Sequence, residues 1–502
     1  MNFMNYITVF NICLRSFIIR QFPFYAVVIL INLSSPLFAQ YESEALKFSM
    51  LQQSGSARFI GMGGAMGALG SEFSCISNNP AGIGMYRNSE LTLTPSLYLA
   101  SNHADYELQG FADDKFNFNF GNIGLVYSKR TNRSEKNGLL FLNFAIGYNR
   151  VNNFNRSVYF EGDDTQHTLA DVMMQRSQGL TPSNLDPFST QLAYNSWLTD
   201  TAGSLTNYES FGPNPLLNKR MTRLINSRGS TGEIALAASA NFSNKFFVGA
   251  NLSVATLTYK NTQVYEELDV NNIHSTFNSL SFTENLDVSG LGINLKLGFI
   301  YRPLNWFRIG VSIHTPTWYN MNETYVNQLK TSLSFGSFTS NSPVGKFEYD
   351  LHAPWRFQAS AGFVIMKHAA IGIDYELVDY SAINLRPATG FFSGPNAFID
   401  SSYAIAHNIR VGAEVRLDPF RIRGGYQYQM NPFNRNVDID ASVHHVSVGA
   451  GFRSKKWFSI DAAYILSMGG GKQTMNREFP DLNPALITYW NHNIVITLGF
   501  HF

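Results

Sequence analysis

The sequence contains few cysteines and few charged residues. Only two cysteines, Cys13 and Cys75, occur among 502 residues. Cys13 lies in a segment that we predict to be removed, so the mature chain is expected to have no internal disulfide and no cysteine metal site. Charged residues make up 15% of the chain, against about 25% in typical soluble domains, and the formal net charge is +1. These values exclude nucleic acid as an expected partner.

Long apolar runs are missing after residue 40. No run approaches the length of roughly 18 residues that a membrane-spanning helix needs, so transmembrane helices are excluded. The apolar run at 24–33 (FYAVVILINL) is too short to span a bilayer, follows Arg15 and Arg20, and is broken by Ser34-Ser35-Pro36. We predict a signal peptide over residues 1–39, cleaved after Ala39; a retained anchor is the alternative.

Catalytic and cofactor motifs are also missing. None of the 11 histidines forms an H-E-x-x-H motif, and no serine lies in a G-x-S-x-G turn. Gly61 and Gly63 begin a dinucleotide-like pattern, but Met66 occupies its third glycine position. We therefore expect no enzyme activity, no metal and no cofactor.

The densest feature present is the glycine-rich stretch from Gly55 to Tyr86. Glycines here permit tight folding in a confined space, and Asn79-Pro80 followed by Gly82 supplies turn chemistry. A short helix is expected just before it, over 41–53. We predict that residues 40–89 form a small hatch inside the rest of the protein.

After the hatch, apolar and polar residues alternate along the chain. In the last eleven residues, Ile494, Ile496, Leu498, Phe500 and Phe502 share one face, as expected of a strand with one apolar face. The same rule predicts about fourteen strands, near 90–101, 115–128, 139–151, 231–242, 245–260, 286–301, 305–315, 355–366, 369–380, 403–416, 419–430, 442–453, 457–468 and 491–502.

The links between these strands alternate in length. Tight links are expected at 243–244, 302–303, 367–368, 418–419 and 454–456, and the links between them are longer. The largest loop is expected over 152–230, and loops of that length are usually functional or mobile. Short turns at one end and long loops at the other are typical of bacterial outer-membrane barrels. We predict an all-β, antiparallel transmembrane barrel over residues 90–502 that encloses the hatch.

Charged residues are concentrated on the inward faces of three neighbouring strands. Alternation points these side chains into the lumen: Asp374, Glu376, Arg410, Glu414, Arg416, Arg421 and Arg423. A lipid-facing Arg at mid-depth would cost about 2–4 kcal/mol, which favours the inward assignment. Two interpretations remain open: a polar lining that stiffens the wall and anchors the hatch, or a carboxylate-binding site that uses Arg410, Arg421 or Arg423.

The strand at 115–128 changes phase in its middle. Phe116, Phe118 and Phe120 share one face, but Ile123 and Leu125 follow on the opposite parity. A one-residue slip predicts a bulge at Gly121-Asn122, either with no special role or as part of an exit through the wall.

Three stretches resemble the FadL/TodX family of outer-membrane transporters of hydrophobic compounds. These are Gly61–Gly70 followed by Asn78-Asn79-Pro80-Ala81-Gly82, Ile309–Tyr319 with its Thr-Pro pair, and Ala353–Tyr380. The resemblance implies passive uptake, with Asn79, Pro80 and Ala81 as the hatch motif. It also implies a ligand that is caught among the outer loops and leaves sideways or past a moved hatch. The family has its wall kink on the third strand, whereas the predicted bulge here lies on the second.

The resulting expectation is a channel in the outer membrane of a Gram-negative bacterium. Its partners would be outer-membrane lipid and a hydrophobic small molecule, such as a fatty acid or an aromatic compound, and we expect a monomer. Two alternatives stay open. One is a general porin for polar solutes, which the hatch argues against, and the other is a binding or adhesion protein that uses loop 152–230.

Overall fold

The computed structural model describes residues 39–52, 54–131, 138–214, 217–366, 368–454 and 457–502. The predicted signal peptide lies outside these residues, apart from Ala39. Within the described ranges, no helix combines the length and the apolar character that crossing a membrane requires.

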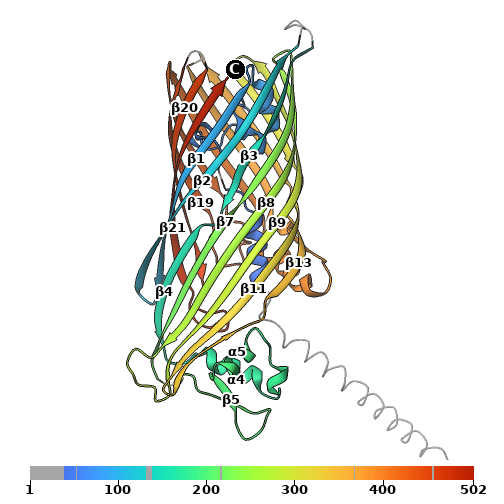
Figure 1. Cartoon of the computed structure of the whole chain (residues 1–502). Helices are drawn as coiled ribbons and strands as arrows, with labels where there is room; N and C mark the ends of the chain where they lie inside the picture. The colour runs from blue at the N-terminus through green and yellow to red at the C-terminus, as the bar shows by residue number, and fades with distance from the viewer. Residues whose placement is uncertain (1–38, 53, 132–137, 215–216, 367, 455–456) are drawn as a thin grey trace, which may run out of the picture.

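Fourteen strands form a closed antiparallel barrel, as predicted. Each pairs with its neighbours along the chain, and β1 pairs with β21 to close the wall (Figure 1). The wall strands are β1 (Glu90–Tyr106), β2 (Gln109–Arg130), β3 (Leu139–Asn153), β7 (Lys219–Phe242), β8 (Phe246–Leu268), β9 (Phe277–Leu304), β10 (Phe307–His314), β14 (Arg356–Ile365), β15 (Ala369–Asp379), β17 (Ile405–Leu417), β18 (Phe420–Gln429), β19 (Val443–Arg453), β20 (Phe458–Gln473) and β21 (Ala485–His501).

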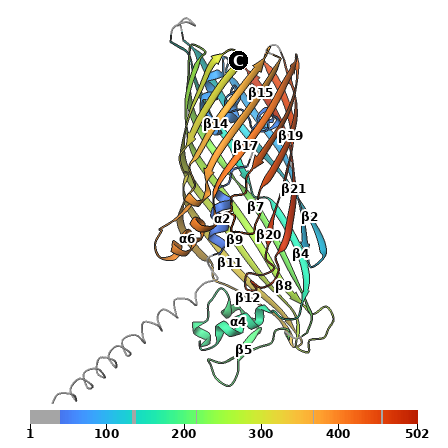
Figure 2. The same cartoon turned by 180° about the vertical axis from the view of Figure 1, so that it is seen from behind.

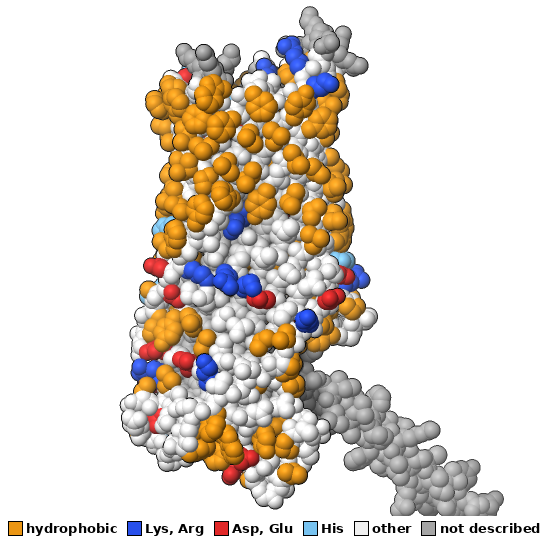
Figure 3. All heavy atoms as spheres, viewed as in Figure 1, with side chains coloured by type: hydrophobic (Ala, Val, Ile, Leu, Met, Phe, Trp, Pro, Cys, Tyr) orange, Lys and Arg blue, Asp and Glu red, His pale blue; other side chains and the backbone are white. Residues whose placement is uncertain are grey.

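The wall is apolar outside and polar inside. On β15, Ile373 is 41% exposed, whereas the next residue, Asp374, is 1% exposed and faces the lumen. Hydrophobic side chains cover the half of the wall nearer the C-terminus (Figure 3). A continuous apolar band of this kind is what the hydrocarbon of a bilayer requires.

Several strands extend further than the sequence predicted. β1 and β2 meet in a turn at Glu107 and Leu108, although 102–114 was expected to be a link. β8 and β9 also run several residues past their predicted ends. These extensions lie beyond the apolar band, and their inner faces bury apolar side chains such as Tyr106, Tyr265 and Phe277. The apolar-outside, polar-inside alternation of the band therefore disappears although the backbone ladder continues. The tight link expected at 302–303 lies instead at 305–306, between β9 and β10.

Additional strands lengthen the wall at the end away from the C-terminus. β10 continues after Thr315–Thr317 into β11, and β13 continues after Ala353–Trp355 into β14. The additional strands are β4 (Arg156–Asp164), β11 (Trp318–Leu333), β12 (Gly336–Asn341), β13 (Gly345–His352) and β16 (Asn384–Arg386). η4 (Tyr380–Ala382), η5 (Gly390–Phe392) and α6 (Ser393–Ser402) connect β15 to β17.

The described residues 39–52 and 54–89 fold inside the barrel (Figures 1 and 2). They form α2 (Ala39–Ser49), α3 (Ala57–Gly61), η1 (Phe73–Ser77) and η2 (Pro80–Met85). The helix expected over 41–53 therefore ends at Ser49. Phe48 packs edge-on against Phe154 and Tyr259, so α2 is fixed to the wall by an aromatic cluster.

The segment expected as one loop, 152–230, contains more structure than predicted. β4 and the first residues of β7 extend the wall. The described residues between them, 165–214 and 217–218, form a segment that we call the lid, at the end opposite the C-terminus (Figure 2). The lid contains α4 (Leu169–Ser177), η3 (Pro182–Asn184), α5 (Thr190–Asn195), β5 (Thr199–Thr201) and β6 (Tyr208–Ser210). Leu169, Met173 and Leu192 pack into a buried apolar cluster with wall residues.

Candidate functional site

Asn79 joins the hatch to the barrel wall. Its Oδ1 accepts a hydrogen bond from the Ala81 N–H at 3.1 Å, which caps η2. Its Nδ2 donates to the Gly67 carbonyl at 2.8 Å and lies 3.4 Å from the wall carbonyls of Phe299 and Val311. One buried amide therefore orders the hatch and attaches it to β9 and β10.

The hatch motif fits against glycines of the wall. A Cβ at Gly249 would lie 2.5 Å from the carbonyl of Pro80, and one at Gly298 would overlap Asn79 Oδ1. Pro80 and Ala81 are both buried. The motif can approach the wall this closely because these wall positions carry no side chain.

The same arrangement continues around the opposite side of the barrel. A Cβ at Gly372 would overlap the carbonyl oxygen of Ala65, and one at Gly412 would overlap that of Met62. Four successive strands place glycines directly opposite one another, at Gly362, Gly372, Gly412 and Gly425. Backbone therefore meets backbone over a wide contact, which leaves little space for the hatch to shift.

The predicted lumen residue Glu376 lies in an ion-pair network. Its carboxylate binds Arg410 Nη2 at 3.0 Å and Arg356 Nη1 at 3.3 Å. Arg356 Nη2 also donates to the carbonyl of Ser49 at 2.7 Å, at the end of α2. All three charged side chains are buried, so the network connects the wall to the hatch where water is scarce.

A second network surrounds the predicted residue Glu414. The hatch residue Arg58 binds it through Nε at 3.0 Å, Arg423 Nε binds at 2.7 Å, and Arg416 Nε binds at 3.1 Å. Arg423 also binds Asp461 at 2.6 Å. One carboxylate is therefore shared by three arginines, and the hatch arginine is one of them.

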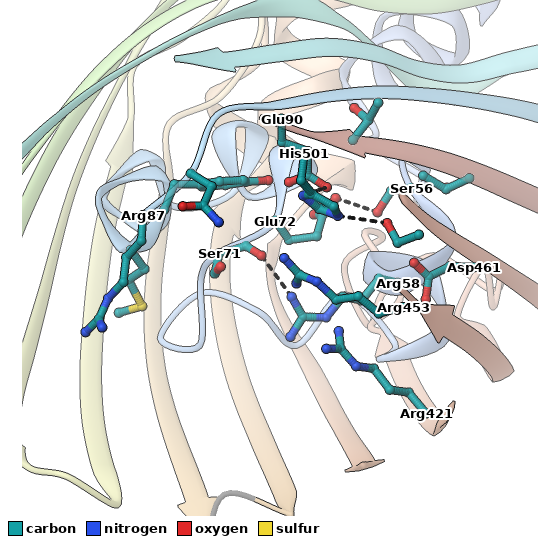
Figure 4. Close-up of a pocket in the computed structure, with 16 residues that line it drawn as sticks. Ser56, Arg58, Ser71, Glu72, Arg87, Glu90, Arg421, Arg453, Asp461 and His501 are labelled. Carbon is teal, nitrogen blue, oxygen red and sulfur yellow. Dashed lines mark hydrogen bonds and ion pairs between the residues drawn. The ribbon is translucent and has the colours of Figure 1, made fainter. Parts of the chain in front are cut away.

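The three arginines that were candidates for carboxylate binding differ in whether they already have a carboxylate partner. Arg410 and Arg423 are already paired with wall carboxylates. Arg421 has no ion pair with any carboxylate in the described part of the chain, and its Nε lacks a hydrogen-bond partner. Together with Arg58 and Arg453 it lines a cavity of about 180 Å³ between hatch and wall (Figure 4). The last predicted lumen charge, Asp374, accepts a hydrogen bond from the hatch, at Gly67 N–H and 3.0 Å.

The predicted bulge is present in β2. Thr94 of β1 pairs with Asn122, but the next residue, Pro95, pairs with Phe120, so Gly121 has no partner in the ladder. A Cβ at Gly121 would lie 2.9 Å from the carbonyl oxygen of Gly55 in the hatch. The slip thus occurs where the wall contacts the hatch.

Beyond the bulge, β2 loses one of its two neighbours. β2 pairs with β3 from Arg130 to Asn122 and no further. Past that point the chain of β3 continues as β4, which pairs with β7 and forms no ladder with β2. We call this boundary, between residues 109–121 of β2 and 156–164 of β4, the seam. Side chains cross it: Ser157 Oγ donates to Asp113 at 2.5 Å, and Lys115 donates to the Ser227 carbonyl at 2.9 Å.

A chain of hydrogen bonds connects the start of the seam to the hatch. Asn122 Nδ2 donates to Asn149 Oδ1 at 3.2 Å, and Asn122 Oδ1 accepts from Thr94 at 3.0 Å. Thr94 lies 2.8 Å from Thr497, whose hydroxyl accepts from the Ala57 N–H at 2.7 Å. A shift of α3 would therefore reach Asn122 through buried, directional contacts.

A cavity of about 470 Å³ occupies the lumen beside α2. The charged side chains of its lining are the cations Lys47, Arg150 and Arg156 and one carboxylate, Glu44. Arg156 Nε donates to the amide oxygen of Asn102 at 3.2 Å, and it forms no ion pair with a carboxylate of the described residues. The aromatic lining residues are Tyr98, Phe154, Tyr259, Phe433 and Tyr489. The cavity therefore offers both apolar surface and hydrogen-bond donors.

The lumen cavity reaches the seam. Asn155 lines it and also lines two cavities outside, of about 300 and 710 Å³, and Arg150 lines the lumen cavity and the smaller outer one. Asn155 lies just before β4, where the wall ladder is interrupted. The interior and the exterior of the barrel thus approach each other at this residue.

Sequence reasoning missed Arg58, Arg156 and Asn155. Arg58 carried a usable signal, because it is the only charged residue between Lys47 and Glu72. A lone charge in a glycine-rich apolar stretch needs a partner. Arg156 and Asn155 lie in a segment that was expected to be loop, so nothing indicated that they face the lumen.

A profile of the family described as outer membrane protein transport protein (OMPP1/FadL/TodX) matches residues 224–495, more than half of the chain. The chain belongs to this family. The predicted resemblance is thereby confirmed, as are the outer-membrane location and the expectation of a transport protein rather than an enzyme. No curated protein sequence matches the chain.

Solved structures share the fold. The crystal structure of a Pseudomonas aeruginosa FadL homologue is 11% identical, with a TM-score of 0.55 over 90% of this chain and 99% of that chain. The Pseudomonas putida toluene transporter TodX is 10% identical (TM-score 0.51, 90% and 100% covered). The Ralstonia pickettii toluene transporter TbuX is 16% identical (TM-score 0.50, 89% and 98% covered). At these identities the likeness concerns the fold alone. The end with short turns and the C-terminus then faces the periplasm.

Proposed function

We propose that this channel carries hydrophobic molecules with an acidic head group, such as fatty acids, passively across the outer membrane. The ligand enters at the lid, occupies the lumen cavity and leaves sideways through the seam. The observation that carries this proposal is that Asn155 lines the lumen cavity and both outer cavities. A hydrophobic molecule that leaves sideways enters the bilayer and avoids crossing water.

The hatch contacts support the sideways route over exit past a moved hatch. The hatch is held by Asn79, by Arg58 bound to Glu414, and by close backbone contact with wall glycines. Moving it would break several buried polar contacts together, and each unpaired buried charge is costly. The seam, in contrast, is crossed by side chains without a backbone ladder, so it opens at lower free energy.

The lining of the lumen cavity supports the ligand class. Five aromatic rings can cover an alkyl chain, and Arg156 presents a guanidinium that has no carboxylate partner among the described residues. Arginine binds carboxylates through two parallel hydrogen bonds. A purely aromatic hydrocarbon would leave this cation without a counter-ion.

The decisive test locks the seam with a disulfide. In a Cys75→Ala background, the pair Asp113→Cys and Ser157→Cys joins β2 to β4, whose side chains already touch at 2.5 Å. Cells that lack their own long-chain fatty-acid channel would express the protein, and uptake of radiolabelled laurate would be measured before and after reduction. We expect at least tenfold lower uptake in the oxidised state and recovery on reduction.

The matched control is the pair Asn320→Cys and Asp350→Cys, whose side chains lie 3.2 Å apart on β11 and β13. Those strands are already paired by a ladder, so oxidation should leave uptake unchanged. Unchanged uptake in the locked seam variant would reject the sideways route. Absence of laurate uptake by the unmodified protein would reject the proposed function itself.

Hatch closure has a separate test. The single-channel conductance of the mature protein should be close to zero, whereas a version without residues 40–89 should show a large and steady conductance. A large pore in the intact protein would favour a general porin instead.

A further inference from the structure

A small cavity on the outer wall at the seam contains cations but no carboxylate. It has a volume of about 300 Å³ and lies between β2, β3, β7 and β8. Its charged lining residues are Arg150, Arg228 and Lys260, and Asn117, Asn155 and Thr258 add neutral polar groups. A cavity lined by three cations and no carboxylate favours an anionic ligand.

The register of the strands brings two of these cations together. Arg228 of β7 pairs directly with Lys260 of β8, and both side chains are exposed. Like charges directly opposite each other destabilise a sheet. Asp287 offsets part of this, because it binds Lys260 at 2.5 Å. Arg228 forms no ion pair in the described part of the chain, so an anion from outside the protein would relieve the repulsion.

Arg150 of β3, on the same side of the seam as β7, and Lys115 of β2, on the other side, add to this charge. Arg150 has a buried Nε without a hydrogen-bond partner. Lys115 reaches across the seam to the Ser227 carbonyl at 2.9 Å and lines the adjoining outer cavity with Arg228 and Lys260. Asp113 is the nearby carboxylate on β2, and it already accepts from Ser157. Four cations therefore face two carboxylates, both of which have partners.

The position of this cluster matches the head-group level of a bilayer. On β7, Ile234 and Leu236 point outward into the apolar band, and Arg228 follows on the same face of the strand toward the extracellular end. Figure 3 shows Lys and Arg side chains crossing the wall just below the hydrophobic band. A lipid with its chains against that band would place its head group beside these residues.

We propose that this cavity binds the phosphate of an outer-leaflet membrane lipid, through Arg150, Arg228 and Lys260. Arginine forms strong charge-assisted hydrogen bonds with phosphate oxygens, and lysine adds a point charge. The bound lipid lies across the outer mouth of the seam. This site does not depend on which molecule the channel carries or on the route by which it leaves.

The experiment is native mass spectrometry of the full mature protein released from detergent micelles. The probes are bisphosphorylated lipid A, the same lipid after removal of both phosphates, and inorganic phosphate alone. At the same collision energy, we expect the unmodified protein to retain one bisphosphorylated lipid and to lose the dephosphorylated lipid. The Arg228→Gln/Lys260→Gln variant should bind the phosphorylated lipid at least tenfold more weakly.

The control variant is Lys330→Gln/Arg435→Gln, which removes two exposed cations without ion pairs elsewhere among the described residues. It should retain the lipid. Equal loss in this control would show non-specific charge attraction and overturn the proposal. Equal retention of the dephosphorylated lipid, or lipid retention by the Arg228→Gln/Lys260→Gln variant, would also overturn it. If inorganic phosphate alone displaces the lipid at micromolar concentration, the site is one for a free ion and the lipid assignment fails.

Folding of the test variant is checked in lipid-free micelles. The single variant Arg228→Gln keeps the ion pair between Lys260 and Asp287, so its melting temperature should be equal to or above that of the unmodified protein, because the repulsion between Arg228 and Lys260 is gone. A lower melting temperature would contradict the argument from like charges.

Discussion

Arg58 of the hatch and Glu414 of β17 form a two-point ion pair, with Nε at 3.0 Å and Nη2 at 3.4 Å, although they lie 356 positions apart in the sequence. Glu414 is 1% exposed. The pair is one of the contacts that decide whether the hatch stays in place, because it is charged, buried and made between hatch and wall.

Glu414→Gln should therefore loosen the hatch. The change leaves Arg58 and Arg423 buried with less counter-charge, and breaking a buried pair in this way costs about 3–5 kcal/mol. We expect faster hydrogen exchange in residues 55–86, with the wall strands unchanged. Glu348→Gln, on an exposed part of β13, is the control. Equal exchange in both variants would show that the pair does not hold the hatch.

Gly412→Ala should push the hatch away from the wall. The added methyl group would meet the Met62 backbone, which cannot move as a side-chain end would, and overpacking typically costs about 1–3 kcal/mol. Limited proteolysis should cut the hatch of this variant faster. Gly424→Ala is a matched control on the next strand, because nothing lies within 4 Å of the added atom. Similar cleavage of the two variants would argue against the close fit.

The hatch should lose stability as the pH rises. Burial raises the pKa of Glu72, despite hydrogen bonds that include one from Ser56 Oγ at 2.5 Å. The folded hatch thus holds this proton more tightly than the unfolded one. Its contribution is fully present below the ordinary glutamate pKa of about 4.3 and is lost as the pH rises through the raised value.

The measurement for Glu72 is the urea midpoint of hatch release between pH 4 and pH 9, followed by proteolysis. Glu72→Gln keeps an acceptor for Ser56 and removes the charge, so its midpoint should vary less with pH. If the urea midpoint of the Glu72→Gln variant still varies fully with pH, another titratable group is responsible for the pH dependence.

The lid should also respond to pH. His167 contacts Asp164 at 3.2 Å and Asp481 at 2.8 Å. Burial alone would lower its pKa, but the hydrogen bonds to both carboxylates outweigh burial and raise it. The resulting stabilisation is present below about pH 6.5 and is lost as the pH rises through the raised pKa. Proteolysis within the lid should be faster at pH 8.5 than at pH 6, and Asp481→Asn should reduce the difference.

Local patterns in the sequence were enough to predict the strands of the wall and one of its irregularities, the bulge in β2. Alternation identified the lipid-facing positions of β15, such as Ile373, because which side a residue faces is fixed by its neighbours in the same strand. The phase slip located the bulge at Gly121 for the same reason. Alternation could not follow the strands past the apolar band, so β4 and the ends of β8 and β9 were missed.

What the sequence determined by itself is a closed barrel with an apolar outside, a polar inside and a glycine-rich segment before it. Each of these follows from composition and spacing within short stretches. The tertiary structure alone decided that Arg58 binds Glu414, that Arg228 faces Lys260, and that β2 loses its second partner, β3, beyond Asn122. Those relationships depend on strand register and on contacts between distant segments. Register is determined by the free energy of pairing along the whole closed wall, which no short stretch of sequence contains.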